Sequence, residues 1–380
     1  MAVDDKGAVT DDKKLAVSRK ARKWLRNLVG LIGACASAVC LIFPAWSEEP
    51  PVQKIGFFEN LLGEKHQPRL PTCAGQDLTE NFSSSEKRTF LSRAGKVING
   101  HARFWKVEKA GIKPSYLFGT MHVTDPDIVN LAEPVKLAFD HADRVILELR
   151  EIADDSGKTI AGRLAGSDDF MTTKKGESFK DKLSPEEFLR FKKALETQGL
   201  SYSLVANSKP WLIFMMLSVP ACETRRQSSG YQALDAKIGQ DAIKLGKPVI
   251  GLETIDEQLA ALDELPLSLF ARAIEDYLNN PDLYKNLFYT QMRLYKTDRI
   301  GEILALNSMF NSGIRASDWN IFNSVMISKR NLRMCKRALP LVKQGNSFIA
   351  VGAAHLVGES GLVEQLRKHN YHVTPVNLAQ

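Results

Sequence analysis

The chain has 380 residues, of which 44% are hydrophobic and 25% are charged, a composition typical of a soluble globular protein with one large or two ordinary domains. The formal net charge is +7, but residues 1–47 alone carry eight Lys/Arg and four Asp/Glu, which leaves a net charge of only +3 for the remainder. So small an excess excludes the basic surface with which nucleic-acid-binding proteins contact phosphates, and we expect no nucleic-acid partner.

The N-terminal segment 1–47 has the pattern of a secretory signal peptide. Seven basic residues between Lys13 and Arg26 precede an apolar run over 28–43, and Ala45-Trp-Ser47 offers a small-x-small cleavage pattern. Sixteen apolar residues are short for a membrane span, which favours cleavage over retention as an anchor with its basic side in the cytoplasm. We therefore expect an exported protein, either periplasmic or anchored in the inner membrane and facing the periplasm, that touches the membrane only through an uncleaved segment.

The cysteines of the mature chain allow one disulfide. Cys35 and Cys40 lie in the signal segment, which leaves Cys73, Cys222 and Cys335. In an oxidising compartment three cysteines form one pair and a free thiol, or no pair at all. We favour a Cys73–Cys222 bridge that ties the N-terminal region to a helical insertion. The chain has no Cys-x-x-Cys spacing, so we do not expect a metal bound by cysteine.

The first part of the mature chain predicts a lead-in followed by a hairpin. Residues 48–100 are rich in proline, serine and charge and predict loose structure with short helices. Alternating apolar residues and turn signals then predict a regular unit. Its elements are strands over 102–108 and 115–120, a helix over 128–141 that Asp125-Pro126 begins, and a strand over 144–149.

A large helical insertion follows, over about 152–343. Ser184 precedes Pro-Glu-Glu and predicts a helix N-cap. Residues 211–219 are strongly apolar but too short to span a membrane, and Pro210 at their start predicts the first turn of a buried helix. One more sheet element interrupts the helices, because residues 247–253 form an apolar run that ends in Glu253.

The end of the chain repeats the plan of its beginning. Residues 347–352 predict a strand, 362–369 a helix and 372–376 a closing strand. We therefore predict an α/β (α+β) fold with a mixed central sheet. The sheet is built from two strand–Gly-x-x-His–helix–strand halves within one domain, 101–380, that the helical insertion divides.

Two Gly-x-x-His motifs supply the main functional signal. Gly119-Thr-Met-His122 and Gly352-Ala-Ala-His355 each end an apolar, strand-like run, and in each the glycine would let the chain turn tightly at the strand end. The spacing alone is weak, because on the order of 0.5 such matches arise by chance and His66 completes a third match in a charged stretch. The context that His122 and His355 share is stronger evidence than the spacing, because each motif follows an apolar run and precedes a helix and a second strand. This context predicts one site at the carboxyl edge of the sheet.

Glu148 and Glu253 each end an apolar strand and precede a helical stretch. A carboxylate there is costly to bury unless a cation, a metal or hydrogen-bond donors accompany it. A structural role as a helix cap or loop contact remains open for both, and Glu253-Thr254 suits a helix start especially well. Arg330-Asn331 lies in a basic helical stretch, for which a solvated face is the default interpretation.

Taken together, His122, His355, Glu148 and Glu253 match the ligand chemistry of a divalent metal. Imidazole and carboxylate ligands suit zinc, cobalt or manganese. Such a metal lowers the pKa of a bound water, and a neighbouring glutamate can accept the proton.

Several motifs along the chain resemble the TraB/PrgY/GumN family, which includes the Tiki proteins. The resemblance covers roughly residues 70–378 and is closest to GumN-type bacterial members. The matching residues are Phe118-Gly-Thr-Met-His122, Leu147-Glu148, Leu234-Asp235, Lys247-Pro248, Leu252-Glu253-Thr254 with Gln258, Arg330-Asn331, and Val351-Gly-Ala-Ala-His355-Leu-Val-Gly358.

This resemblance implies a metal-dependent, protease-like site of the kind held to exist in the Tiki branch. It makes His122, Glu148 and His355 the metal and catalytic residues, with Arg330 as a helper. TraB and PrgY members are associated with shutting down peptide pheromones by cleavage or sequestration, and the GumN name comes from exopolysaccharide gene clusters. The resemblance thus supports a peptide or protein substrate less directly than it supports the site.

Three functions follow from these observations. The first is an exported metal-dependent hydrolase that acts on a peptide bond. The second is a non-catalytic protein that captures a peptide at the same pocket. The third is a role in exopolysaccharide metabolism with Glu148 and Glu253 as an acid/base pair, which requires carboxyl groups about 5–10 Å apart across an open cleft.

Overall fold

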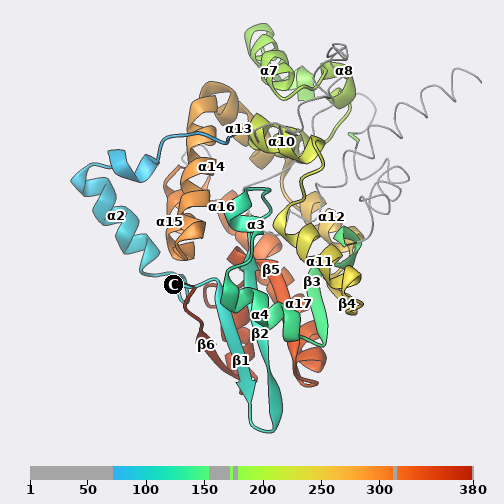
Figure 1. Cartoon of the computed structure of the whole chain (residues 1–380). Helices are drawn as coiled ribbons and strands as arrows, with labels where there is room; N and C mark the ends of the chain where they lie inside the picture. The colour runs from blue at the N-terminus through green and yellow to red at the C-terminus, as the bar shows by residue number, and fades with distance from the viewer. Residues whose placement is uncertain (1–71, 154–171, 174–178, 311–314, 379–380) are drawn as a thin grey trace, which may run out of the picture.

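The computed structural model describes residues 72–153, 172–173, 179–310 and 315–378. A six-stranded mixed sheet with the strand order β4-β3-β5-β2-β1-β6 forms its centre (Figure 1). This confirms the predicted α/β class with a mixed central sheet. The strands are β1 (Phe104–Lys109), β2 (Ile112–Thr120), β3 (Arg144–Leu149), β4 (Val249–Glu253), β5 (Ser347–Gly352) and β6 (His372–Pro375).

The two halves of the sheet interleave. Strand β5 from the C-terminal half lies between β2 and β3 of the first half and runs parallel to both. Thr120 pairs with Gly352, so β2 and β5 end at the same level. On the far side, β1 pairs antiparallel with β2 and with β6. The ends of the two Gly-x-x-His strands are therefore neighbours.

The predicted helix over 128–141 was wrong in its extent, because two short helices replace it. These are α3 (Pro126–Val129), which Asp125 caps by accepting from the backbone of Asp127, and α4 (Glu133–His141). Pro134 has no N–H to continue a helix through Asn130, but it is well suited to the first turn of a new one.

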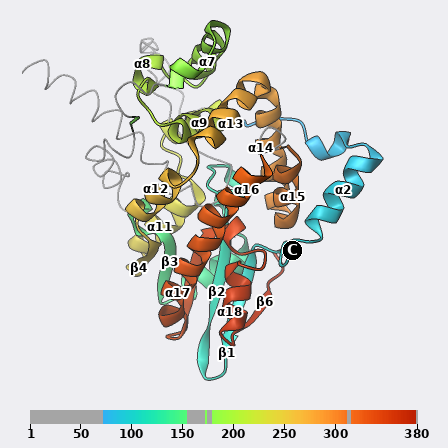
Figure 2. The same cartoon turned by 180° about the vertical axis from the view of Figure 1, so that it is seen from behind.

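Helices cover both faces of the sheet and one of its ends. Helix α4 lies on the face seen in Figure 1, and α17 (Arg330–Val342) and α18 (Leu362–Lys368) lie on the face seen in Figure 2. Strand β2 runs from the hairpin tip toward the helical insertion (Figure 1), so the carboxyl ends of the parallel strands face that insertion.

The insertion is mainly helical within the described residues, as predicted. Ser184 caps α7 in a capping box with Glu187, and the residues of α9 from Trp211 to Ile213 are buried. The further helices, in chain order, are α7 (Pro185–Thr197), α8 (Tyr202–Val205), α9 (Pro210–Ser218), α10 (Ala221–Ser228), α11 (Leu234–Lys244), α12 (Ile255–Asp263), α13 (Leu267–Asn279), α14 (Pro281–Lys296), α15 (Ile300–Phe310), α16 (Ala316–Phe322) and the π-helix η7 (Asn323–Lys329).

The lead-in contains the 3-10 helix η3 (Leu78–Asn81) and the helix α2 (Ser84–Ala94). The predicted disulfide is present: Cys73 is bonded to Cys222 of α10, 149 positions away in sequence. Cys335 of α17 is buried as a free thiol. The bridge thus ties the lead-in to the insertion.

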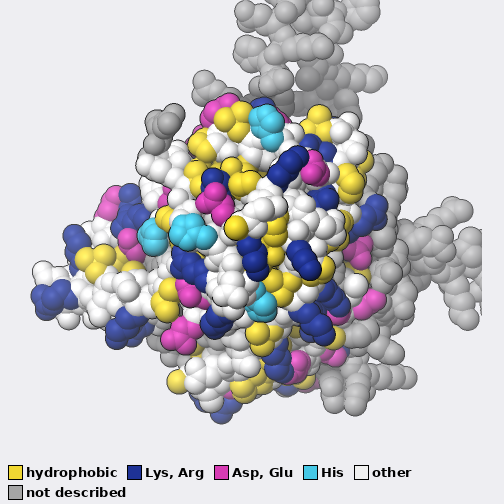
Figure 3. All heavy atoms as spheres, turned by 90° about the horizontal axis from the view of Figure 1, so that it is seen from below, with side chains coloured by type: hydrophobic (Ala, Val, Ile, Leu, Met, Phe, Trp, Pro, Cys, Tyr) yellow, Lys and Arg dark blue, Asp and Glu magenta, His cyan; other side chains and the backbone are white. Residues whose placement is uncertain are grey.

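The predicted signal segment, 1–47, lies outside the described residues. Among the residues that are described, no helix is long and apolar enough to cross a membrane. The molecular face seen from below mixes Lys and Arg with acidic, histidine and hydrophobic side chains (Figure 3).

Candidate functional site

Three neighbouring strands bring the predicted site residues to one edge of the sheet. Glu148 lies near the end of β3, His355 lies in the 3-10 helix η8 (Ala353–His355) directly after β5, and His122 follows β2. All three side chains are buried, with 0–3% of their surface exposed. The structure therefore brings His355 to the same edge as two residues that precede it by more than 200 positions in sequence.

Close packing explains the glycine of the first motif. A Cβ atom on Gly119 would lie 2.8 Å from the Cδ1 atom of Leu356 and 2.9 Å from the Cα atom of Ala353. Real Cβ contacts of that length essentially do not occur, so only glycine lets β2 approach the segment that carries His355. The expected tight turn is not the reason, because neither Gly119 nor Gly352 has a positive φ.

Asp235 of α11 orients the His122 ring. The Nδ1 atom of His122 contacts the Asp235 carboxylate, which also accepts a hydrogen bond of 2.5 Å from the Thr120 hydroxyl. Burial lowers the pKa of His122, but the charge and hydrogen bond of Asp235 outweigh burial and raise it. With Nδ1 held, the buried Nε2 atom of His122 is left with no hydrogen-bond partner among the described residues.

Asn331 of α17 holds the second imidazole. Its Oδ1 atom lies 2.6 Å from Nδ1 of His355, and because this oxygen can only accept, the proton of the ring lies on Nδ1. The Nε2 atom of His355 then faces Glu148, at 3.9 Å from Oε1. Both histidines are therefore anchored through Nδ1 and present Nε2, the arrangement in which second-shell partners orient metal-binding imidazoles.

Glu148 has a pKa close to neutrality. Its Oε1 atom accepts a hydrogen bond of 2.6 Å from the backbone N–H of Gly352, and its Oε2 atom accepts one of 3.0 Å from Arg330. Burial raises the pKa of Glu148 to about 7, against the opposing charges of Arg330 and His122. A carboxyl group that titrates near pH 7 is well matched to proton transfer.

Arg330 joins the carboxylate near the end of β3 to the one that ends β4. Its Nη2 atom donates to Glu148 at 3.0 Å and to Glu253 at 2.5 Å, and its Nε atom donates to Glu253 at 2.9 Å. The solvated face expected for Arg330-Asn331 was wrong, because both residues have no exposed surface. They follow the π-helix η7, whose wider turn changes which side chains face the sheet.

Both carboxylate oxygens of Glu253 accept hydrogen bonds from arginine side chains. Its Oε1 atom accepts from Arg333 at 3.0 Å, and its Oε2 atom accepts from Arg330 and from Gln258, the latter at 3.3 Å. Its predicted role as a metal ligand is not supported by these contacts, because arginine holds both of its oxygens. Glu253 instead positions Arg330 beside Glu148.

A comparison with known families shows which family the chain belongs to. The family profile described as TraB/PrgY/gumN matches residues 103–375, which include both Gly-x-x-His motifs, both glutamates and Arg330. The chain belongs to the TraB/PrgY/gumN family.

Relatives of this TraB/PrgY/gumN protein include proteins named as metalloproteases. It is 26% identical over 308 residues to Metalloprotease TIKI2 of Xenopus tropicalis, covering 68% of this chain and 57% of that protein. It is 25% identical over 307 residues to Metalloprotease TIKI1 of Danio rerio, covering 68% of this chain and 60% of that protein. Uncharacterized protein YbaP of Shigella flexneri is 26% identical over 265 residues, covering 68% of this chain and 89% of that protein.

The chain thus spans less than two thirds of the length of the TIKI proteins that it matches. No solved structure matches it.

The donor atoms at this edge fit a divalent metal in kind. The unpartnered, buried Nε2 atom of His122 needs a partner, and imidazole nitrogens with a carboxylate oxygen suit zinc, cobalt or manganese. Their spacing is wider than a bound ion requires. Ligand atoms around a tetrahedral ion lie about 3.3 Å apart, whereas Nε2 of His355 is 3.9 Å from Oε1 of Glu148. Within the described ranges, no group of three or more His, Cys, Asp or Glu side chains is arranged to hold a metal ion.

The sequence motifs did not assign roles to Asp235 and Asn331. Asp235 stands in the first turn of α11, where an acidic residue is expected for local reasons alone. Asn331 follows Arg330 in a basic helix. The only available signal was that both belong to the motifs that resemble the family.

Proposed function

We propose that this protein is an exported metal-dependent hydrolase that acts on a peptide bond. The single observation that carries the proposal is the convergence of two imidazoles, each anchored through Nδ1, on a buried carboxyl group with a pKa near 7. The metalloprotease names of the TIKI relatives support the reaction class. Export rests on the predicted signal segment.

In this proposal His122 and His355 hold the metal through their Nε2 atoms, and Glu148 ligates it or serves as general base. When bound, the metal would polarise the peptide carbonyl and lower the pKa of a water molecule. Glu148 would take the proton of that water at Oε1, while Arg330 keeps Oε2 in place. Asp235 and Asn331 would keep each ring in the tautomer whose Nε2 atom is a ligand.

Metal content tests the proposal directly. Purified residues 48–380 should retain about one divalent metal per chain, and His122→Ala or His355→Ala should lose it. His372→Ala is the matched control, because His372 is exposed at the start of β6, an edge strand that β1 separates from the strands carrying the site. Equal metal content in the wild type and in both site variants would refute the metal centre.

A non-catalytic peptide-binding protein is the second candidate. It is favoured by the fact that both oxygens of Glu148 already accept hydrogen bonds, one from Gly352 and one from Arg330. Such a protein would bind peptides without turnover whichever metal was added, and its site variants would keep their affinity. The polysaccharide acid/base pair fits poorly, because the Arg330 guanidinium lies between two buried carboxylates where an open cleft would be needed.

A further inference from the structure

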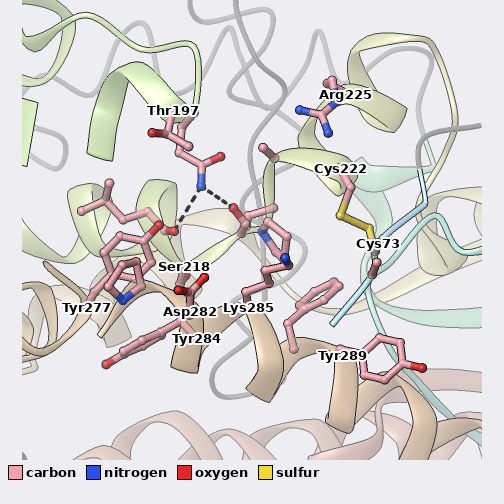
Figure 4. A pocket seen from close by; sticks show the side chains of 18 of the residues that line it. Cys73, Thr197, Ser218, Cys222, Arg225, Tyr277, Asp282, Tyr284, Lys285 and Tyr289 are labelled. Atoms are coloured by element: carbon pink, nitrogen blue, oxygen red, sulfur yellow. Dashed lines mark hydrogen bonds between the residues drawn. A yellow bond between two sulfur atoms is a disulfide. The ribbon is translucent and has the colours of Figure 1, made fainter. Parts of the chain in front are cut away.

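A pocket of about 340 Å³ lies away from the histidines, between the lead-in and the helical insertion. The Cys73–Cys222 disulfide borders it on one side and Tyr277 and Tyr284 on the other, with Lys285 between them (Figure 4). Its volume is at the lower end of the range for ligand sites, roughly 300–1,000 Å³, so it suits a small group rather than a long chain.

The lining combines an apolar, aromatic interior with a cationic rim. Phe288 and Val219 are buried at the pocket, and Tyr289 adds a third tyrosine ring to its wall. Arg225 and Lys285 are exposed there, and neither forms an ion pair with any residue that the structure describes. Since Asp282 is the single acidic residue in the lining, the charge of the rim is positive.

We infer that this pocket binds the C-terminal residue of a peptide substrate, with its apolar side chain among the tyrosines and its carboxylate at Arg225 and Lys285. The inference rests on the proposed function. A small apolar pocket beside two cations, neither of which forms an ion pair with a described residue, complements a group that is apolar and anionic within a few bonds. The last residue of a peptide has this combination.

Two helices connect this pocket to the histidine site. Cys222 of α10 lines the pocket, and the next residue, Glu223, is fully buried and accepts a hydrogen bond of 2.6 Å from the backbone N–H of Thr124, two residues after His122. Phe288 of α14 also lines the pocket, and Tyr295 of the same helix donates to the Gly119 carbonyl at 2.8 Å. A peptide end held here would contact the helices that support the first Gly-x-x-His motif.

Binding of short labelled peptides tests this inference. Residues 48–380, stripped of metal with a chelator so that no turnover occurs, are titrated against the N-terminally labelled peptide Gly-Ser-Gly-Leu, and fluorescence anisotropy is recorded. We expect the free-acid peptide to bind and its C-terminal amide to bind roughly tenfold more weakly, because two partly solvated ion pairs are lost. The variant Arg225→Gln/Lys285→Gln should weaken the free acid to the level of the amide.

The control variant is Lys87→Gln/Arg88→Gln, which removes the same charge from exposed positions on α2 and should leave affinity unchanged. Equal binding of acid and amide, or full affinity in the pocket variant, would overturn the inference. Competition by acetyl-leucine as strong as by unlabelled Gly-Ser-Gly-Leu would show that a free carboxylic acid, rather than a peptide, is the ligand. Arg225→Gln/Lys285→Gln should retain the same amount of divalent metal as the wild type when it is purified without a chelator, so failure of the metal site and failure of this pocket are distinguishable.

Discussion

Replacing Arg330 with methionine should expose how strongly the sheet edge depends on one buried cation. Arg330 has no exposed surface, and its guanidinium is shared by Glu148 and Glu253. Methionine keeps much of the side-chain volume and removes the charge. The variant would leave the Glu148 carboxylate buried without the cation that donates to it, whereas Glu253 would still be bonded to Arg333 and Gln258.

Breaking a buried pair by removing one partner costs about 3–5 kcal/mol. Because Glu253 keeps two partners and Glu148 keeps the Gly352 N–H, we expect the lower end, about 3 kcal/mol at pH 8. Burial already raises the pKa of Glu148 to about 7, and the loss of Arg330 should raise it further. An acid whose folded-state pKa is raised contributes stability below its unfolded pKa and loses it as pH rises through the folded value. The cost should therefore shrink at pH 5, where the Glu148 carboxyl is neutral.

Urea unfolding of residues 48–380, followed by circular dichroism in the presence of a chelator, measures this cost at both pH values. Arg333→Met is the control, since Arg333 contacts Glu253 but is 34% exposed, and it should cost at most about 1 kcal/mol. The reasoning is refuted if Arg330→Met is no less stable than the control at pH 8, or if its deficit is equal at pH 5 and pH 8.

Three further changes test other contacts. Glutamine at position 148 cannot ionise, so the free energy of unfolding of Glu148→Gln should rise relative to that of the wild type as the pH is raised from 5 to 8. Urea titrations without metal measure this; if the difference in free energy between variant and wild type is the same at both pH values, the raised pKa is contradicted. Gly119→Ala should lower the free energy of unfolding by about 1–3 kcal/mol, because its Cβ atom would clash with Ala353. An unchanged thermal unfolding midpoint would show that the two motifs are not tightly packed. Asp235→Asn should weaken metal affinity roughly 10–100-fold in chelator competition, while Asp241→Asn on the same helix should not; equal affinities would remove Asp235 from the site.

Tertiary contacts explain why the default interpretation of Arg330 and Asn331 from sequence was wrong. Their stretch is basic, and on an isolated helix such residues face water. Glu148 and Glu253 come from strands 182 and 77 positions away and supply the compensating charges for Arg330. The π-helix before α17 also changes the helical phase on which a periodic reading depends.

Tertiary contacts and a local proline also explain two other wrong predictions, one of a helix boundary and one of the role of a glycine. Pro134 divides the helix predicted over 128–141, although a helical periodicity runs across it. Gly119 was expected to allow a tight turn, but its lack of a side chain matters for contact with Leu356 and Ala353 on a distant segment. In both cases the residue type marked a position with a structural constraint, but the neighbouring sequence did not show what that constraint was.

Local sequence by itself determined the strand-like runs, the capping of helices such as α7, and the two Gly-x-x-His motifs, because these depend on backbone preferences and periodicity within about ten residues. Only the tertiary structure decided that β5 inserts between β2 and β3, which makes the two motifs neighbours. It also decided which partner each imidazole has, Asp235 for His122 and Asn331 for His355. Such pairings depend on strand order and on helix placement against the sheet, and these are set by the packing of the whole core.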